Sequence, residues 1–229
     1  MGTIRKSPLP GHLPGGGVTQ PADDARNAAA VAEKKRLRPL CLARRESLPQ
    51  DERAAADDAL CGALLSAPLW QTARLICLYV PMRGEPDILP LWRRGQALDK
   101  RIALPVCGTA RSLSFRLMPG YGAMFLRPGP YGTQEPTEDC LPLPLADLDG
   151  ALMLSFDGDG YRLGYGGGYY DTLLYTLAAH GIAPITVGVT YACCLAPCLP
   201  HQTHDVPVRY VLSEGRLAPA HAKRDDFAR

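Results

Sequence analysis

The chain contains 229 residues, of which 46% are hydrophobic and 21% are charged, and 25 basic side chains nearly balance 23 acidic ones. This composition is typical of one folded globular domain and excludes a disordered or collagen-like protein. A formal net charge of only +2 also disfavours a protein that mainly tracks nucleic acid or an anionic membrane, so any anionic ligand must be held by a local site.

No apolar run approaches the length that spans a membrane, and the first thirty residues lack the apolar core of a signal peptide. Eight cysteines are scattered along the chain, most of them in apolar segments such as LICLYV, where a free thiol packs as a small hydrophobic side chain. We therefore expect a cytoplasmic protein, a monomer or weak dimer, whose partners are small molecules and not nucleic acid or membrane.

The N-terminal third is predicted to be helical after a short leader. Residues 1–25 are rich in glycine and proline and show no hydrophobic periodicity, which predicts a disordered leader. A basic helix is expected over residues 24–47, where Pro39 should either kink it or start a fresh helix. A second helix is expected over residues 51–66, where Leu60 and Leu64 recur at helical spacing.

The rest of the chain alternates short apolar runs with helical or turn-rich segments. Strands are expected at 73–80, 101–106, 113–118, 151–156, 184–191 and 207–213. Helices are expected at 87–98 and 169–180. This alternation predicts an α/β fold, a single three-layer domain with a mostly parallel sheet covered by helices.

A loop of unusual length is expected over residues 119–147, which are rich in proline and glycine. Long loops without secondary structure are uncommon in compact domains and often have a function. We therefore interpret this segment as a cover over a site.

The most distinctive segment is RLGYGGGYYD, residues 162–171, which lies between the strand expected at 151–156 and the helix that begins near Tyr169. In that context, backbone N–H groups and a helix N-terminus can hold a phosphate together. Neither common nucleotide motif applies, because the third glycine of a dinucleotide fingerprint would fall on Tyr169, and no Gly-Lys-Ser/Thr follows. A plain glycine-rich loop tip is the alternative.

The wider stretch FDGDGYRLGYGGGYYD, residues 156–171, resembles the signature of the 5-formyltetrahydrofolate cyclo-ligases, which reads close to FDxxGxRLGxGxGYYDR. Other features of that family recur in the same order, over roughly residues 30–215: the basic run 34–38, a Tyr-x(5)-Glu segment at 79–85, Leu-Pro at 104–105 and His-Asp at 204–205. The resemblance implies a Rossmann-like domain of the NagB/RpiA/CoA-transferase type over residues 26–215, followed by a polar tail at 216–229.

The resemblance also implies an activity and its site. The activity is the ATP-dependent cyclisation of 5-formyltetrahydrofolate to 5,10-methenyltetrahydrofolate, with Mg²⁺ as cofactor and ATP as co-substrate. Arg162 and Asp171 would be catalytic, and Asp171 and Asp205 would hold the metal. ATP would contact Lys34, Lys35, Arg36, Leu37, Arg38, Arg162, Leu163, Gly164, Tyr165, Gly166, Gly167, Gly168, Tyr169 and Tyr170. The reduced folate would contact Val80, Glu85 and Tyr169.

These residue types suit the chemistry. Phosphoryl transfer spreads charge over oxygens, so it needs cations, backbone donors and Mg²⁺ more than a covalent nucleophile. Arg162 can donate a forked pair of hydrogen bonds to phosphate, the glycines let the backbone approach closely, and Asp171 is a hard oxygen ligand. Lys34 and Arg38 lie four residues apart on one helix face, so both can reach one polyphosphate, although a basic helix can also be a merely solvated face.

Three positions depart from the pattern of the family: Leu152 replaces a common proline, Thr172 a common arginine and Arg209 a common acidic residue. Pro39 inside the basic helix is also unusual for the family. Two other functions therefore remain open, a non-catalytic folate- or nucleotide-binding protein and a small-molecule kinase of the same fold. A further cluster, Cys193, Cys194, Cys198, His201 and His204, has enough soft ligands for zinc, but its spacing matches no standard site. We expect no zinc there.

Overall fold

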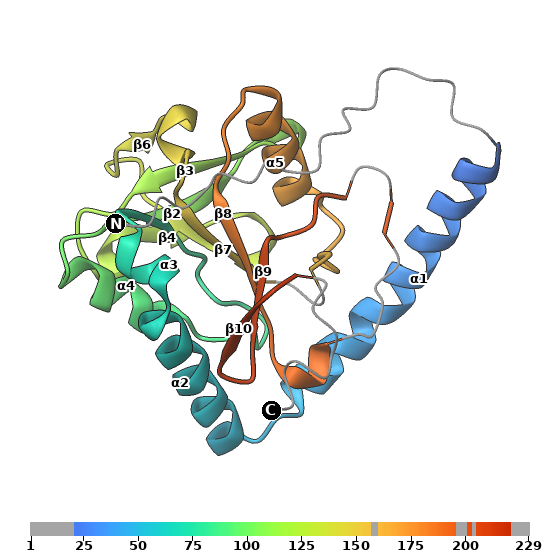
Figure 1. Ribbon diagram of the computed structural model, residues 1–229, viewed down its shortest axis with the longest axis horizontal. Coiled ribbons are helices and arrows are strands. Elements are labelled where there is room, and N and C mark those ends of the chain that lie inside the picture. Colours follow the sequence, from blue (N-terminus) through green and yellow to red (C-terminus); the bar gives the residue numbers. More distant parts are fainter. Residues whose placement is uncertain (1–20, 157–159, 196–200, 203–204, 221–229) are drawn as a thin grey trace.

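The computed structural model of the protein describes residues 21–156, 160–195, 201–202 and 205–220. Within these residues an eight-stranded mixed sheet is flanked by helices, and a separate two-stranded ribbon lies beside it (Figure 1). The helices are α1 (Pro21–Glu46), α2 (Gln50–Ser66), α3 (Pro68–Thr72), α4 (Leu89–Gln96) and α5 (Tyr169–Ala179). Short 3₁₀ turns are η1 (Thr109–Arg111), η2 (Ala123–Phe125), η3 (Pro130–Gly132), η4 (Leu145–Leu148) and η5 (Ala192–Cys194).

The sheet has the strand order β10-β9-β8-β7-β1-β2-β3-β6. Its strands are β1 (Leu75–Cys77), β2 (Arg101–Cys107), β3 (Leu113–Leu117), β6 (Pro142–Leu143), β7 (Leu152–Phe156), β8 (Ile185–Val189), β9 (Tyr210–Ser213) and β10 (Arg216–Pro219). The five central strands β9, β8, β7, β1 and β2 pair in parallel, and the remaining pairs at both edges are antiparallel. The predicted mostly parallel sheet is confirmed.

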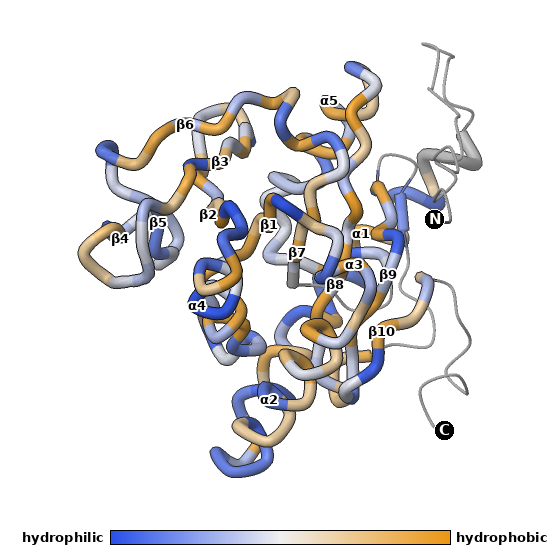
Figure 2. The backbone as a smooth tube through the Cα atoms, turned by 60° about the vertical axis from the view of Figure 1, so that its left-hand side comes forward, coloured by the Kyte–Doolittle hydropathy of each residue, from blue (hydrophilic) through white to orange (hydrophobic). Residues whose placement is uncertain are grey.

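Helices cover both faces of the sheet because its central strands are apolar on both sides. Side chains alternate along a strand, so Ile76 faces one core together with α2, α3 and α4, while Cys77 faces a second core together with α5. In Figure 2 the tube alternates between orange and blue along α2 and α4, as expected of helices with one apolar face. The predicted three-layer arrangement is therefore confirmed.

The order of the strands creates a crevice between β1 and β7. From β1 the chain proceeds outward to β2, whereas from β7 it proceeds in the opposite direction to β8 and β9. In an open parallel sheet, the loops after two such strands diverge and leave a ligand-binding crevice at their carboxyl ends. The segment 78–88 follows β1, and the segment that includes the glycines at 164–168 follows β7.

Several expectations differ from the structure at the ends of the chain. Helix α1 begins at Pro21, so residues 21–25, expected to belong to the leader, are helical; residues 1–20 lie outside the described part. Proline is tolerated in a first helical turn, because its missing N–H would have no partner there. Residues 216–219, expected to belong to a polar tail, form β10 and pair with β9.

Pro39 does not start a fresh helix, since α1 runs as one element through it to Glu46. Tertiary contacts on both sides explain this continuity. Arg38 donates hydrogen bonds to the carbonyls of Leu163 and Gly164, and Cys41 packs in a buried cluster with Leu163 and Cys194. None of the described helices combines the length and the apolar character needed to cross a membrane.

The segment 119–147 is not a plain loop. It contains the two-stranded ribbon of β4 (Leu126–Pro128) and β5 (Gln134–Pro136), as well as the edge strand β6. These strands are two or three residues long and contain proline, so they leave no periodic pattern in the sequence.

Candidate active site

A cavity of about 920 Å³ lies at the carboxyl ends of the central strands, in the upper part of the size range common for small-molecule sites. Its walls come from α1, the loop after β1, the end of β2, the β4–β5 ribbon, the glycine segment and the start of α5. Among the residues expected to form the site, those that line this cavity are Lys34, Arg38, Val80, Glu85, Arg162, Leu163, Gly164, Tyr165, Gly166, Gly167, Gly168, Tyr169, Tyr170, Asp171 and Asp205.

Three residues expected to contact ATP lie outside the cavity. Lys35 and Arg36 are exposed, and Arg36 pairs with Glu33 at 2.6 Å on the surface of α1. Leu37 packs against the buried cluster that contains Cys41. Each residue turns a helix by about 100°, so only the face of α1 that carries Lys34 and Arg38 looks toward the site.

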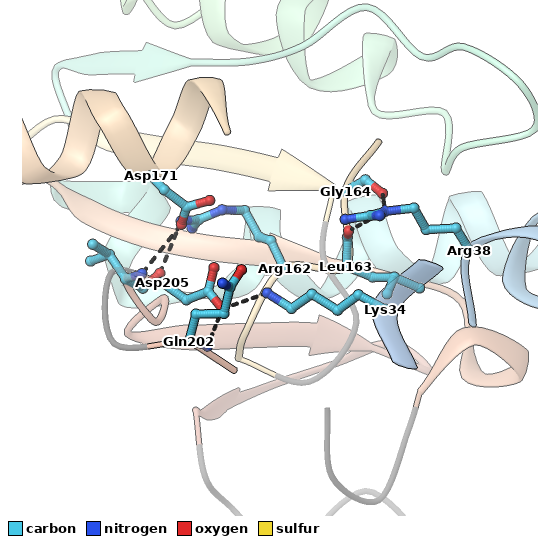
Figure 3. A network of polar contacts seen from close by, with 9 residues as sticks. Lys34, Arg38, Arg162, Leu163, Gly164, Asp171, Gln202 and Asp205 are labelled. Carbon is cyan, nitrogen blue, oxygen red and sulfur yellow. Dashed lines mark hydrogen bonds and ion pairs between the residues drawn. The ribbon is translucent and has the colours of Figure 1, made fainter. Parts of the chain in front are cut away.

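Lys34 and Arg38 connect α1 to segments that follow much later in the chain (Figure 3). Lys34 forms a buried ion pair with Asp205, whose Oδ2 atom also accepts a hydrogen bond from the backbone N–H of Gln202 at 2.6 Å. Arg38 Nε donates to the carbonyl oxygens of Leu163 and Gly164 at 3.2 and 3.1 Å. Two cations of the same helix face are therefore fixed at the edge of the cavity.

Arg162 is buried, and the described residues use only two of its five N–H donors. Its Nη2 atom donates to Asp171 Oδ1 at 2.5 Å and to the carbonyl of Val206 at 2.9 Å. Its Nε and Nη1 atoms are buried and have no hydrogen-bond partner within the described part of the chain. Buried donors are almost always satisfied, so these two atoms of a cavity-lining guanidinium indicate a place for ligand oxygens.

The glycine segment lets the backbone approach a ligand. Gly166 has φ +90°, in the left-handed region that side chains rarely adopt, and a Cβ there would lie 3.3 Å from the guanidinium carbon of Arg38. Gly168, with φ +70°, immediately precedes the first turn of α5 and has no side chain to cap it. The first residues of α5 therefore line the cavity together with the cationic side chains of Lys34, Arg38 and Arg162, an arrangement suited to a polyphosphate.

Glu85 forms a different part of the wall. Its carboxylate is buried, and it accepts hydrogen bonds from the Tyr165 hydroxyl on Oε1 at 2.7 Å and from the Met82 N–H on Oε2 at 3.0 Å. Burial raises the pKa of this carboxyl, and the two hydrogen bonds oppose that shift. Val80, half-buried beside it, supplies apolar surface. A buried acceptor next to an apolar wall suits the N–H edge of a flat heterocycle.

Four further residues lie in the cavity or its wall. Tyr131 and Glu135 come from the β4–β5 ribbon: the Tyr131 hydroxyl lies 3.3 Å from that of Tyr169, and buried Glu135 accepts the Cys107 N–H at 3.0 Å. Their only signal was the unusual length of the segment 119–147. Arg111 also lines the cavity, and buried Arg45 lies behind Tyr165.

The donor set is compatible with a magnesium ion that arrives with a nucleotide. Within the described ranges, no group of three or more His, Cys, Asp or Glu side chains is arranged to hold a metal alone. Asp171 and Asp205 both line the cavity, and each uses one carboxylate oxygen in an ion pair. Mg²⁺ commonly takes one or two carboxylates and completes its shell with phosphate oxygens and water.

The proposed zinc ligands cannot be compared as a set, because Cys198 and His204 lie outside the described residues. His201 stacks on Tyr161 with ring centroids 4.2 Å apart, and Cys194 is buried beside Cys41. Of the three departures from the family pattern, Thr172 lines the cavity, Leu152 is buried in the core, and Arg209 does not line the cavity.

Comparisons with known proteins identify the family of the chain. A family model described as the 5-formyltetrahydrofolate cyclo-ligase family matches residues 30–214. The chain is 31% identical over 188 residues to the 5-formyltetrahydrofolate cyclo-ligase of Mycolicibacterium smegmatis, covering 80% of this chain and 94% of the relative. It is 26% identical over 181 residues to the enzyme of the same name from Escherichia coli K12, covering 76% and 96%.

Two solved structures share the fold. The NMR structure of Aquifex aeolicus 5,10-methenyltetrahydrofolate synthetase matches with a TM-score of 0.67 and 29% identity, covering 83% of this chain and 94% of that one. The 5,10-methenyltetrahydrofolate synthetase of Mycoplasma pneumoniae matches with a TM-score of 0.58 over 78% of this chain and 97% of that one; at 20% identity it supports the fold alone.

Proposed function

The chain belongs to the 5-formyltetrahydrofolate cyclo-ligase family, and from that premise we propose that it converts 5-formyltetrahydrofolate and ATP into 5,10-methenyltetrahydrofolate, ADP and phosphate. The observation that carries the proposal is that one cavity combines a wall of cationic side chains with a buried acceptor. Arg162 has two unused donors beside the glycine segment, while Glu85 lies in the loop after the neighbouring strand β1. A polyphosphate and a heterocycle rich in N–H groups therefore have separate places within reach of each other.

In the proposed reaction the formyl oxygen of the folate attacks the γ-phosphorus of ATP, and ADP leaves. The folate N10 then bonds to the activated formyl carbon and gives up its proton, the C–O bond breaks, and inorganic phosphate departs with the former formyl oxygen. Arg162, Lys34 and the N–H groups around Gly166 stabilise the charge that moves over the phosphate oxygens. Asp171 and Asp205 would hold Mg²⁺, which neutralises phosphate charge when bound.

The direct test is an absorbance assay with purified protein, 5-formyltetrahydrofolate and MgATP. We expect the methenyl-folate band to rise with release of one ADP and one phosphate for each product, and chelation of Mg²⁺ with EDTA to stop the reaction. Binding of both substrates without a rise in absorbance would favour the non-catalytic alternative. Phosphate retained on the product would favour a kinase.

The role of Glu85 gives a second expected result. Glu85→Gln removes the charge of an acceptor and places an NH₂ group where a carboxylate oxygen was, so we expect the KM for folate to rise about ten-fold or more. The KM for ATP should stay within about two-fold. Steady-state kinetics with each substrate varied in turn measures both. Glu138→Gln is the matched control, because that side chain is 81% exposed; equal losses for both substrates in Glu85→Gln would contradict the assignment.

A further inference from the structure

Three segments far apart in the sequence meet at the hydroxyl of Tyr165. Arg45 from α1 donates from Nη2 to the Tyr165 oxygen at 2.7 Å, and the Tyr165 hydroxyl donates to Glu85 Oε1 at 2.7 Å. The sequence separations are 120 and 80 residues. Glu85 is thus connected through Tyr165 to the same helix that carries Lys34 and Arg38.

The direction of these hydrogen bonds is determined by chemistry. A guanidinium can only donate, so the Tyr165 oxygen must be the acceptor from Arg45, and its single proton is left to point at Glu85. The backbone N–H of Met82 donates to the other carboxylate oxygen at 3.0 Å. Both oxygens of Glu85 therefore accept from the protein, and its remaining lone pairs can only accept from a ligand.

Arg45 and Arg83 also hold the ring of Tyr165 in place. Their guanidinium carbons lie 5.7 and 5.3 Å from the ring centroid, within the range of cation–π attraction. Arg45 is only 3% exposed, and its Nε atom donates to the carbonyl of Arg83 at 2.7 Å. The tyrosine is 47% exposed, so its position depends on these contacts more than on burial.

Tyr165 stands where two cavities meet. It lines the main cavity and also an adjacent one of about 280 Å³, which Arg45 and Cys41 help to line. The hydroxyl points from this shared wall to Glu85 and not to the Arg162 group. That placement separates Tyr165 from the phosphate contacts that its position in the glycine segment implied.

We propose that Tyr165, oriented by Arg45, is a positioning residue for the folate: it fixes Glu85 as a charged acceptor aimed at N–H donors of the pterin. This inference rests on the proposed function, because it requires a folate beside Glu85. It assigns Tyr165 to recognition of the folate and not of ATP, although the residue belongs to the glycine segment.

The same geometry predicts a dependence on pH. Burial raises the pKa of Glu85, and the hydrogen bond from Tyr165 counteracts this more than the other contacts do. The charged or titratable groups that face Glu85 are Tyr79, Arg83, Arg45, Tyr165 and Tyr170. Without the Tyr165 hydroxyl the pKa of Glu85 rises further. Folate binding is expected to need the ionised form of Glu85. A variant without the Tyr165 hydroxyl should therefore lose activity at a higher pH than the wild type as the solution is acidified.

The test is a double-mutant cycle of Tyr165→Phe and Glu85→Gln, read by folate and ATP kinetics, by calorimetric binding of 5-formyltetrahydrofolate, and by the pH profile of kcat/KM for folate. We expect Tyr165→Phe to raise the KM and Kd for folate about ten-fold, to leave the KM for ATP within about two-fold, and to shift the acid limb to higher pH. In the Glu85→Gln background the same change should raise the KM and Kd for folate by less than about two-fold.

Tyr121→Phe is the matched control. Tyr121 is 42% exposed, an arginine lies 4.8 Å from the centroid of its ring, and it does not line the cavity.

The outcomes separate the inference from the proposed function. If the wild type binds the folate without turning it over, the proposed function is wrong, and a ten-fold weaker Kd for Tyr165→Phe still supports the positioning role. If the wild type turns over and Tyr165→Phe changes only ATP kinetics, or if the two substitutions have additive effects, the positioning role is wrong. A wild type that does not bind folate overturns both.

Discussion

Arg162→Lys is expected to lower kcat by about 10²- to 10³-fold, the usual scale for loss of a preorganised donor at developing charge. Lysine keeps the positive charge but has one ammonium group in place of a planar fork. In the structure one nitrogen of Arg162 already serves Asp171 and Val206, while two others are left for a ligand. A lysine that pairs with Asp171 has no donor at the positions that Nε and Nη1 of Arg162 occupy. The KM for folate should change little, because the partners of Glu85 are untouched.

Absorbance kinetics together with thermal unfolding measures this effect. Arg101→Lys provides the control, because Arg101 is also paired with an aspartate, Asp147 at 2.9 Å, but lies on the surface outside the cavity. The control should keep full activity. If Arg162→Lys retained more than a tenth of wild-type kcat while remaining folded, Arg162 would serve only to anchor Asp171, and the charge on the phosphate would have to be stabilised elsewhere.

The second large effect is expected for α1. Replacing Lys34 and Arg38 together with alanine should lower kcat/KM for ATP by at least about 100-fold, because each substitution removes a charge-assisted hydrogen bond to phosphate on the order of 1.5 to 3 kcal/mol. Most of the loss should appear as a higher KM for ATP. Nucleotide titration and steady-state kinetics measure it.

The chain offers a control on another face of the same helical turn. Lys35 and Arg36 carry the same charges but lie outside the cavity, so their double alanine variant should bind ATP as the wild type does. Lys34 also neutralises the buried Asp205, and its loss can destabilise the fold. The single variant Arg38→Ala keeps that ion pair and should still weaken ATP about ten-fold. Normal ATP binding by a folded double variant would contradict the placement of phosphate beside α1.

The central sheet could be predicted from sequence for a clear physical reason. Parallel strands covered on both faces are apolar throughout, as in LICLYV and ALMLSF, and the helix predictions at 51–66, 87–98 and 169–180 coincide with α2, α4 and α5. The edge strands escaped prediction because they depend on a neighbour. β6 is two residues long, and β10 has the sequence RLAP, which forms a strand only by pairing with β9.

The residues of the candidate site also fall into two groups, those that a local sequence pattern indicated and those that only the fold brings together. A contiguous motif revealed Arg162 and the glycines, whereas Arg45 was only one more arginine in a basic helix until the fold placed it behind Tyr165. All five residues of the run 34–38 were predicted to contact ATP. A helix turns each successive side chain away from its neighbour, so only its first and last residues face the cavity. Contacts between distant segments leave no local pattern in the sequence.

The ion pair between Lys34 and Asp205 also fixes when the site can form during biosynthesis. The two residues are 171 positions apart, and at a ribosomal rate of roughly 5 to 20 residues per second Asp205 is added about 10 to 30 seconds after Lys34. Until residues 163 and 164 are added, the cationic face of α1 lacks the carbonyl partners of Arg38, and until residue 205 is added it lacks the partner of Lys34. The glycine segment, 125 residues after Arg38, and then Asp205 must emerge from the ribosome before these contacts of α1 can form, so the nucleotide-binding wall is completed only when most of the chain has been made.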